Sequence, residues 1–194
     1  MEEQFDVINE QDEVIGQAAR SAVHAQGLWH RGVHVFLFTA DGRMLIQQRS
    51  ADRKQYPSLW DCSVSEHVKA GEDYVNAARR GLWEELGLRD VTLTPRLRFR
   101  LNYGPNDNEI SLLFTGTVDP ARVQFDPVEI ARVDYLSIAE LLDWAGRDES
   151  DLCYWFIQLL RWYAGGEKAV SRKGDPAGFN GVVDVGQLVE LSSQ

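Results

Sequence analysis

Two adjacent carboxylates, Glu84 and Glu85, stand near the end of a stretch whose pattern predicts a helix from about Asp73 to Leu86. Neighbouring negative charges repel each other, and the carboxyl end of a helix also disfavours negative charge. A bound Mg²⁺ or Mn²⁺ would relieve both costs, because hard cations select carboxylate oxygens. On these residues alone, the alternative is a solvent-exposed ion pair between Glu84 and Arg80, one helical turn earlier.

The spacing around this pair favours the metal site. From residue 66 to residue 88 the chain reads EHVKAGEDYVNAARRGLWEELGL. This segment resembles the Nudix box, in register at Glu72, Arg80, Leu82, Glu84, Glu85, Gly87 and Leu88. The resemblance implies an α+β fold, a Nudix-type α/β/α sandwich with a mixed sheet. It also implies a divalent cation bound by the box helix and hydrolysis of a small molecule that contains a (nucleoside) diphosphate.

Two box positions depart from the pattern. Glu66 replaces the first glycine, and Gly81 replaces the glutamate that follows Arg80. In Nudix hydrolases that glutamate helps to bind metal or serves as a base. Glycine inside a helix costs up to ~1 kcal/mol relative to alanine, so helix propensity does not explain Gly81. Glu66 could restore a carboxylate from the preceding loop.

Outside the box, the chain is similar to the isopentenyl-diphosphate isomerase branch of the superfamily over roughly residues 5–165. The segments that carry this similarity are DVINEQDEVIG, His30-Arg31, QQRSADRKQYPSLWD and NDNEISLLF. In such isomerases, histidines and two acidic residues hold a second metal. The similarity implies the ligands His30, His67, Asp107 and Glu109, with His24 matching at a spacing shifted by one residue. Such a donor set suits Zn²⁺ or Mn²⁺.

Isomerisation also needs a cysteine and a glutamate that move protons on carbon. The cysteine position is Ser65 here, and a hydroxyl is far less acidic than a thiol. Cys62 lies three residues earlier and does not match that position. The arginine that contacts the diphosphate in those isomerases would fall at Gly81. Two other diphosphate-contacting positions match Arg49 and Arg53, for which solvated loop charges are the alternative.

From these residues we expect a divalent-metal-dependent pyrophosphohydrolase that uses Mg²⁺ or Mn²⁺. Its expected metal ligands are Glu84, Glu85, Glu66, His30, His67, Asp107 and Glu109, with Glu129 as a further carboxylate. Glu85 and Glu109 are the expected catalytic residues, and Glu109 is the expected general base. The expected substrate ligands are Arg49, Arg53 and Arg80. The alternatives are isopentenyl-diphosphate isomerisation and a catalytically weak ligand-binding module, while His34 is expected to be structural.

The elements that would position these residues follow from hydrophobic periodicity and turn residues. Strands are expected at residues 5–8, 13–15, 34–39, 44–48, 91–101, 109–118 and 133–136, with 59–68 irregular or extended. Besides the helix over 73–86, with Val75, Ala78, Leu82 and Leu86 facing the core, 18–26 is expected to be a short helix or loop. The capping box Ser137-Ile-Ala-Glu140 predicts a helix through Trp144, and another is expected from Ser150. Segregated rather than alternating elements indicate an α+β mixed sheet.

Length and composition limit the function class. The 194 residues predict a Nudix domain over 1–165 and a Gly-rich tail over 166–194. A net charge of −10 disfavours binding to a nucleic acid polymer or an anionic membrane. Two cysteines are too few for a disulfide scaffold, and no apolar run approaches the ~20 residues of a membrane span. We therefore expect a cytoplasmic protein with a small-molecule partner, and a possible homodimer through its Trp-rich last helix.

Overall fold

The chain folds around a seven-stranded mixed sheet. The structure is a computed structural model that describes residues 2–104 and 106–165, so the expected tail 166–194 lies outside the described residues. The strands of this sheet are β3 (His30–Phe38), β4 (Met44–Arg49), β5 (Trp60–Asp61), β6 (Val64–His67), β7 (Thr94–Gly104), β8 (Asp107–Thr117) and β9 (Ile130–Leu136). The order β5-β4-β3-β8-β7 forms its main path, while β6 pairs with β3 and β9 pairs with β4. Strands β3 and β8 run parallel and the other pairs are antiparallel, which makes the sheet mixed.

Strands β3 and β4 separate soon after the turn that joins them. They pair at Phe38 and Met44, and β3 then pairs with β6 instead. Ser63 bridges the separation, because its hydroxyl accepts from the backbone N–H of Leu37 (2.8 Å) and donates to the carbonyl of Leu45 (2.6 Å). This split lets β6 lie beside β3 while β4 pairs with β5 and β9.

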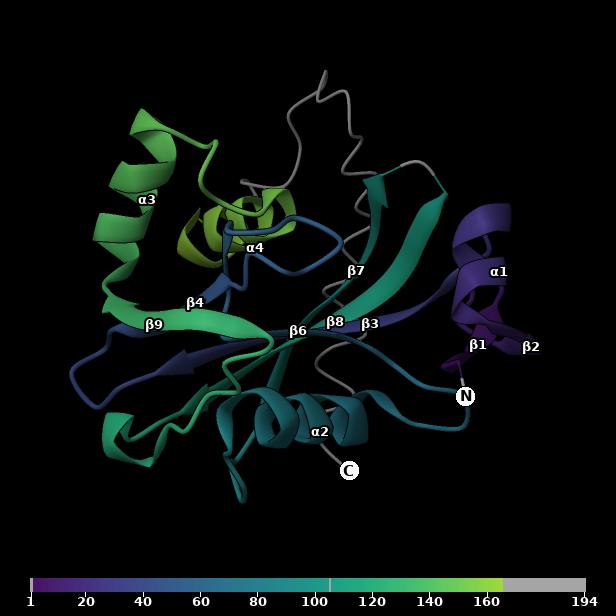
Figure 1. The fold of residues 1–194 in the computed structure, drawn as a ribbon, viewed down its shortest axis with the longest axis horizontal. Helices are drawn as coiled ribbons and strands as arrows, with labels where there is room; N and C mark the ends of the chain where they lie inside the picture. Colours follow the sequence, from purple (N-terminus) through teal and green to yellow (C-terminus); the bar gives the residue numbers. More distant parts are fainter. Residues whose placement is uncertain (1, 105, 166–194) are drawn as a thin grey trace.

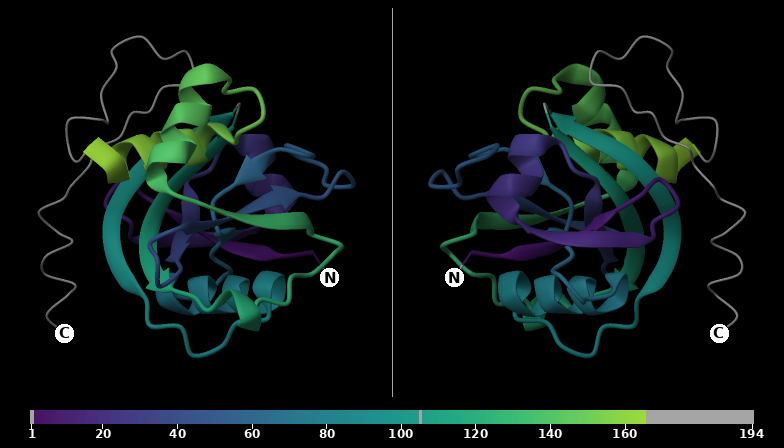
Figure 2. Two further views of the ribbon diagram at one scale, coloured as in Figure 1. Left: turned by 90° about the vertical axis from the view of Figure 1, so that its left-hand side faces the viewer. Right: turned by 90° about the vertical axis from the view of Figure 1, so that its right-hand side faces the viewer.

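Helices cover both faces of the sheet. Figures 1 and 2 show α2 (Tyr74–Leu86) below the sheet and α3 (Ile138–Arg147) with α4 (Tyr154–Gly165) above it. The hairpin β1 (Gln4–Ile8) and β2 (Val14–Ala19), with α1 (Arg20–Gln26), stands at one side of the molecule (Figure 1). A short 3₁₀ helix, η1 (Pro120–Arg122), follows β8. The expected α/β/α sandwich with a mixed sheet is confirmed.

Helix α2 begins and ends as its sequence predicts. The Asp73 side chain accepts from the backbone N–H of Asn76, and Gly87 ends the helix in the left-handed region at φ 67°. The prediction for Val75 is wrong, because this side chain is exposed. In the first turn Tyr74, not Val75, continues the buried stripe formed further along by Ala78 and Leu82.

Other element boundaries shift for local reasons. The capping box of Ser137 and Glu140 is confirmed at the start of α3. The last helix begins at Tyr154 rather than Ser150, because residues 151–153 lie along Trp60: Trp60 N–H donates to Asp151 O and Cys153 N–H donates to Trp60 O, both at 2.8 Å. The strand expected from residue 34 starts at His30, where its parallel pairing with β8 begins.

Both cysteines are free and buried, in keeping with the expected absence of a disulfide scaffold. Across residues 2–104 and 106–165, none of the helices has the length and apolar character needed to cross a membrane. The cytoplasmic location and the homodimer stay predictions.

Candidate active site

One face of three adjacent strands carries a line of polar side chains. In the β3–β8 register His30 pairs with Glu109 and Gly32 with Ser111, and in the β3–β6 register Gly32 pairs with His67. Because alternate residues of a strand share a face, the side chains from these three strands meet on one side of the sheet. His67 and Glu109 border a pocket of about 560 Å³, which also reaches the carboxyl half of α2.

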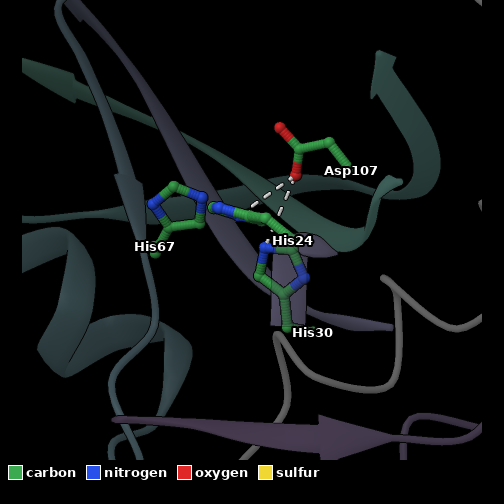
Figure 3. Close-up of side chains that lie close together, drawn as sticks. All are labelled: His24, His30, His67 and Asp107. Carbon is green, nitrogen blue, oxygen red and sulfur yellow. Dashed lines mark ion pairs between the residues drawn. The ribbon is translucent and has the colours of Figure 1, made fainter. Parts of the chain in front are cut away.

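A histidine centre forms at one end of this pocket. It consists of His24, His30, His67 and Asp107, whose nearest ligand-type atoms all lie within 4.8 Å of one another (Figure 3). The Asp107 Oδ1 atom is 3.5 Å from His24 Nε2 and 3.7 Å from His30 Nε2. The Oε1 atom of Glu109 adds a second carboxylate, 3.6 Å from His30 Nε2 and 3.3 Å from His67 Nε2.

The polar atoms at the middle of the histidine centre have no hydrogen-bond partner. These atoms are His24 Nε2, His30 Nε2 and Asp107 Oδ1, all of them buried. The other ring nitrogen of His30 lies 3.1 Å from the carbonyl of Leu28, which places the proton on Nδ1 and leaves the Nε2 lone pair directed at the centre. Buried polar atoms without partners are costly, so this arrangement is what a bound cation would satisfy.

Burial sets the protonation of this centre. It lowers the pKa of His30 to about 4, so the ring is neutral near pH 7 and able to ligate. Burial and the neighbouring Glu109 charge raise the pKa of Asp107, and burial raises that of Glu109. Two acidic groups held close together in a buried site are a recurrent feature of cation sites.

The turn after α1 brings His24 into this centre. Gly27 caps α1 in the left-handed region at φ 64°, so the chain reverses between His24 and His30. An ideal Cβ at Gly27 would lie 3.3 Å from Asn106 Oδ1, and a side chain there would also be strained by the positive φ. Spacing alone left His24 outside the expected ligand set, and Gly27 was the sequence signal that could have included it.

A second glycine makes room for Glu109. An ideal Cβ on Gly32 would lie 1.9 Å from Glu109 Oε2 and 2.7 Å from Ser111 Oγ. Ser111 Oγ donates to Glu109 Oε2 at 2.8 Å, which fixes the carboxylate and leaves Oε1 facing His30 and His67. The structure thus holds the expected general base in one orientation.

At the other end of the pocket lies a box centre, formed by Glu66, Glu84 and Glu85 with Arg80. The Arg80 guanidinium donates to Glu66 (2.9 Å), to Glu84 (3.2 Å) and to the carbonyl of His67 (2.8 Å). It also binds both carboxylate oxygens of Glu72, at 3.0 and 3.1 Å. All five N–H groups of Arg80 are engaged in this way, so its expected contact with substrate would require it to release an acceptor.

Glu85 is the buried member of the box centre. It is 7 % exposed, and its Oε2 accepts from Gln47 Nε2 at 2.7 Å. Burial, followed by the charge of Glu66, raises the pKa of Glu85 well above its ordinary value. Glu84 is more exposed and pairs with Arg80, which is the ion pair that sequence analysis offered as the alternative to metal.

The loop between β4 and β5 carries the two expected phosphate ligands. Arg49 donates to the carbonyls of Tyr56 and Gln55, both at 3.1 Å, and its Nη1 lies 3.5 Å from the buried Asp61. Arg53 is ion-paired with Glu129. Both arginines border the pocket, but Arg49 also holds the loop in shape.

Ser65 also borders the pocket. Its Oγ is 3.2 Å from Nδ1 of the buried His34, whose Nε2 is 2.5 Å from the Tyr103 hydroxyl. Burial lowers the pKa of His34 to about 3, so this ring is neutral. Cys62 is fully buried and does not border the pocket, so it does not replace the missing thiol.

Most residues expected from the sequence come together in this pocket. Those that border it are Arg49, Arg53, Glu66, His67, Arg80, Glu84, Glu85, Asp107, Glu109 and Glu129. His30 is fully buried beside it. Sequence reasoning missed Gln47 and Tyr103; Gln47 lies inside an expected strand, Tyr103 lies between the strands expected at 91–101 and 109–118, and neither forms part of a motif.

Comparison with known proteins agrees with this geometry. The sequence model of the NUDIX domain matches residues 28–156. A protein of Pseudomonas aeruginosa described as an uncharacterized Nudix hydrolase is 34% identical over 126 residues, which cover 64% of this chain and 74% of that protein. An isopentenyl-diphosphate Delta-isomerase of Serratia proteamaculans is 30% identical over 165 residues, covering 83% and 91% of the two chains.

Solved structures show the same fold. A crystal structure of a Deinococcus radiodurans protein superposes with a TM-score of 0.70 and 28% identity, covering 82% of this chain and 98% of that one. The family match, the relatives and the mixed sheet with its box helix lead to one conclusion: the chain belongs to the Nudix hydrolase family.

Proposed function

We propose that this protein is a divalent-metal-dependent pyrophosphohydrolase that cleaves a small molecule containing a diphosphate. The observation that carries the proposal is one pocket that carboxylates of both centres border together with Arg49 and Arg53. Carboxylates hold the cation and arginines neutralise phosphate oxygens, so the pocket provides both halves of diphosphate recognition.

The histidine centre fits a cation by its donor set. Three imidazoles and one or two carboxylates suit Mn²⁺ or Zn²⁺, and three buried atoms of the centre have no hydrogen-bond partner. The box centre offers carboxylates only, and these suit Mg²⁺ or Mn²⁺. A cation in this pocket would polarise a phosphoryl oxygen and lower the pKa of an attacking water.

The chain's own residues would supply the remaining steps. Glu109 is the general base of the proposal, because Ser111 fixes its Oε2 and its Oε1 faces the centre beside His30 and His67. Glu85 is oriented by Gln47 and would act within the box centre. Arg53 would bind the departing phosphate after exchanging its contact with Glu129.

Product analysis tests the proposal. The purified chain is incubated with Mg²⁺ or Mn²⁺ and with nucleotide-linked, nucleoside and prenyl diphosphates. We expect metal-dependent cleavage at a diphosphate bond, and a loss of about 100-fold or more in Glu85→Gln. The matched variant Asp126→Asn removes a carboxylate that borders the same pocket but lies outside both centres, and it should retain activity. Binding without turnover of any diphosphate would refute hydrolysis and favour a ligand-binding module.

The histidine centre also favours a second candidate, isopentenyl-diphosphate isomerisation. The donor set alone is compatible with both hydrolysis and isomerisation. Isomerisation is the less favoured of the two, because Ser65 stands at the position of the proton-donating thiol. Within the described part of the chain no cysteine borders the pocket. A rearranged prenyl diphosphate in the product analysis would support isomerisation, and its absence with cleavage of another substrate would exclude it.

A further inference from the structure

The two departures from the box pattern face each other in space. Gly81 lies inside α2, where an ideal Cβ would be 2.6 Å from Val64 Cγ1 and 3.0 Å from Glu66 Cγ. Real Cβ atoms do not approach other atoms as closely as 2.6 Å, so a side chain at position 81 would force Val64 to shift and would crowd Glu66. The glycine is therefore explained by the close approach of Val64 and, less closely, of Glu66 to the helix, despite its unfavourable helix propensity.

Glu66 reaches the box centre across this gap. Its Oε2 accepts from Arg80 Nη1 at 2.9 Å, and Glu84 accepts from the same nitrogen at 3.2 Å. Its charge contributes to the raised pKa of Glu85. Glu66, Glu84 and Glu85 also border the same pocket. The strand residue thus shares the partner Arg80 with Glu84, and its charge acts on Glu85.

The exchange is reciprocal. The box pattern has glycine where this chain has Glu66 and glutamate where it has Gly81, so the carboxylate has moved from the helix to the facing strand. We propose, resting on the proposed function, that Glu66 is the third carboxylate ligand of the box centre, and that Gly81 lets the β6 side chains of Val64 and Glu66 pack against the helix. The centre then keeps the number of carboxylates that the pattern provides, with one of them approaching from β6.

Manganese binding to the full chain tests this assignment. One equivalent of Zn²⁺ is added first, because imidazole-rich sites bind it more tightly than Mn²⁺, and Mn²⁺ is then titrated while the free ion is measured by electron paramagnetic resonance. We expect Glu66→Gln to weaken Mn²⁺ binding at least tenfold. The matched control is Glu72→Gln, which removes an equivalent charge from another partner of Arg80 that does not border the pocket, and it should bind Mn²⁺ as the wild type does.

The reciprocal exchange itself gives a second test. Gly81→Glu alone should lower the melting temperature, since its side chain meets Val64 and Glu66. Combining it with Glu66→Gly restores the box pattern, and we expect the double variant to recover Mn²⁺ binding relative to Glu66→Gly alone. Equal Mn²⁺ affinity in Glu66→Gln and the wild type would overturn the proposal, as would a double variant that folds but binds no better than Glu66→Gly.

These outcomes are distinguishable from failure of the proposed function. If the wild type cleaves no diphosphate but Mn²⁺ binding depends on Glu66, the ligand assignment stands without the hydrolysis. If the wild type is a hydrolase and Glu66→Gln neither binds Mn²⁺ more weakly nor loses activity, the hydrolysis stands. In that case Glu66 serves only as a partner of Arg80.

Discussion

Replacing Asp107 with asparagine should change stability differently with and without a bound cation. Without a cation, Asp107 faces the buried Glu109, and burial together with this charge raises its pKa. The neutral amide removes that repulsion, so we expect the metal-free variant to be as stable as the wild type or more stable. With a cation, the variant lacks an anionic ligand, so it should be stabilised less than the wild type.

The size of the effect follows from linkage. Zn²⁺ at a free concentration 100 times its Kd stabilises a folded protein by up to about 2.7 kcal/mol. In a domain of this size about 1 kcal/mol shifts the melting temperature by roughly 2–4 °C, so the wild type should gain about 5–11 °C. Changing groups outside the first ligand sphere already weakens metal binding about 10–100-fold. A loss of about 100-fold in Asp107→Asn would leave only ~0.4 kcal/mol at the same Zn²⁺ concentration.

Differential scanning calorimetry of protein first stripped with a chelator measures both states. Glu84→Gln is the control, because this partly exposed carboxylate belongs to the box centre and should keep the full Zn²⁺ shift. An absent Zn²⁺ shift in the wild type would refute a cation site at the histidine centre. If Zn²⁺ raises the melting temperature of Asp107→Asn as much as that of the wild type, Asp107 is not a ligand of the cation. If the variant is destabilised equally with and without Zn²⁺, the role of Asp107 is structural.

Three further predictions concern the surroundings of the site. Burial lowers the pKa of His34 to about 3 in the folded protein, so the unfolded chain takes up a proton first as pH falls below about 6.5. The free energy of unfolding should fall by about 2 kcal/mol from this residue at pH 5, and urea melts of His34→Gln should show a flatter pH dependence. Arg80→Met leaves the carboxylates around it unpaired and should destabilise by roughly 1–3 kcal/mol, which urea melts at pH 7 test. Ser137→Ala removes the cap of α3 and should cost about 1 kcal/mol in urea melts without changing metal binding.

The sequence predicted those parts of the fold that local patterns determine. The helix over 73–86 has a capping aspartate and a terminal glycine, and both act as expected. The wrong start of the last helix has a different origin, since Cys153 pairs with Trp60, a residue far away in the sequence. Periodicity within a segment does not contain such pairings. The prediction that Val75 faces the core was wrong, because four apolar residues at helical spacing do not determine where the edge of the buried face lies.

The site was predictable in its residue types but not in its geometry. The acidic and basic residues follow from motif spacing, and the structure brings most of them to one pocket. The spacing could not show that Arg80 binds Glu66, Glu72 and Glu84 together, because these contacts join a strand, a loop and a helix. Nor could it place His24, whose approach to His30 depends on the left-handed turn at Gly27.

Strand β6 explains how a single short element serves both centres. It pairs with β3 alone, and alternate side chains of a strand point to opposite faces. His67 therefore joins the histidine centre, while Glu66 lies over Gly81 on the side of α2. Moving the register of β6 by one residue would exchange these faces and separate both glutamate and histidine from their partners. Gly32 pairs with His67, and Gly81 allows the side chains of β6 to approach α2 closely. These two glycines therefore help to fix the register of β6, and with it the positions of Glu66 and His67.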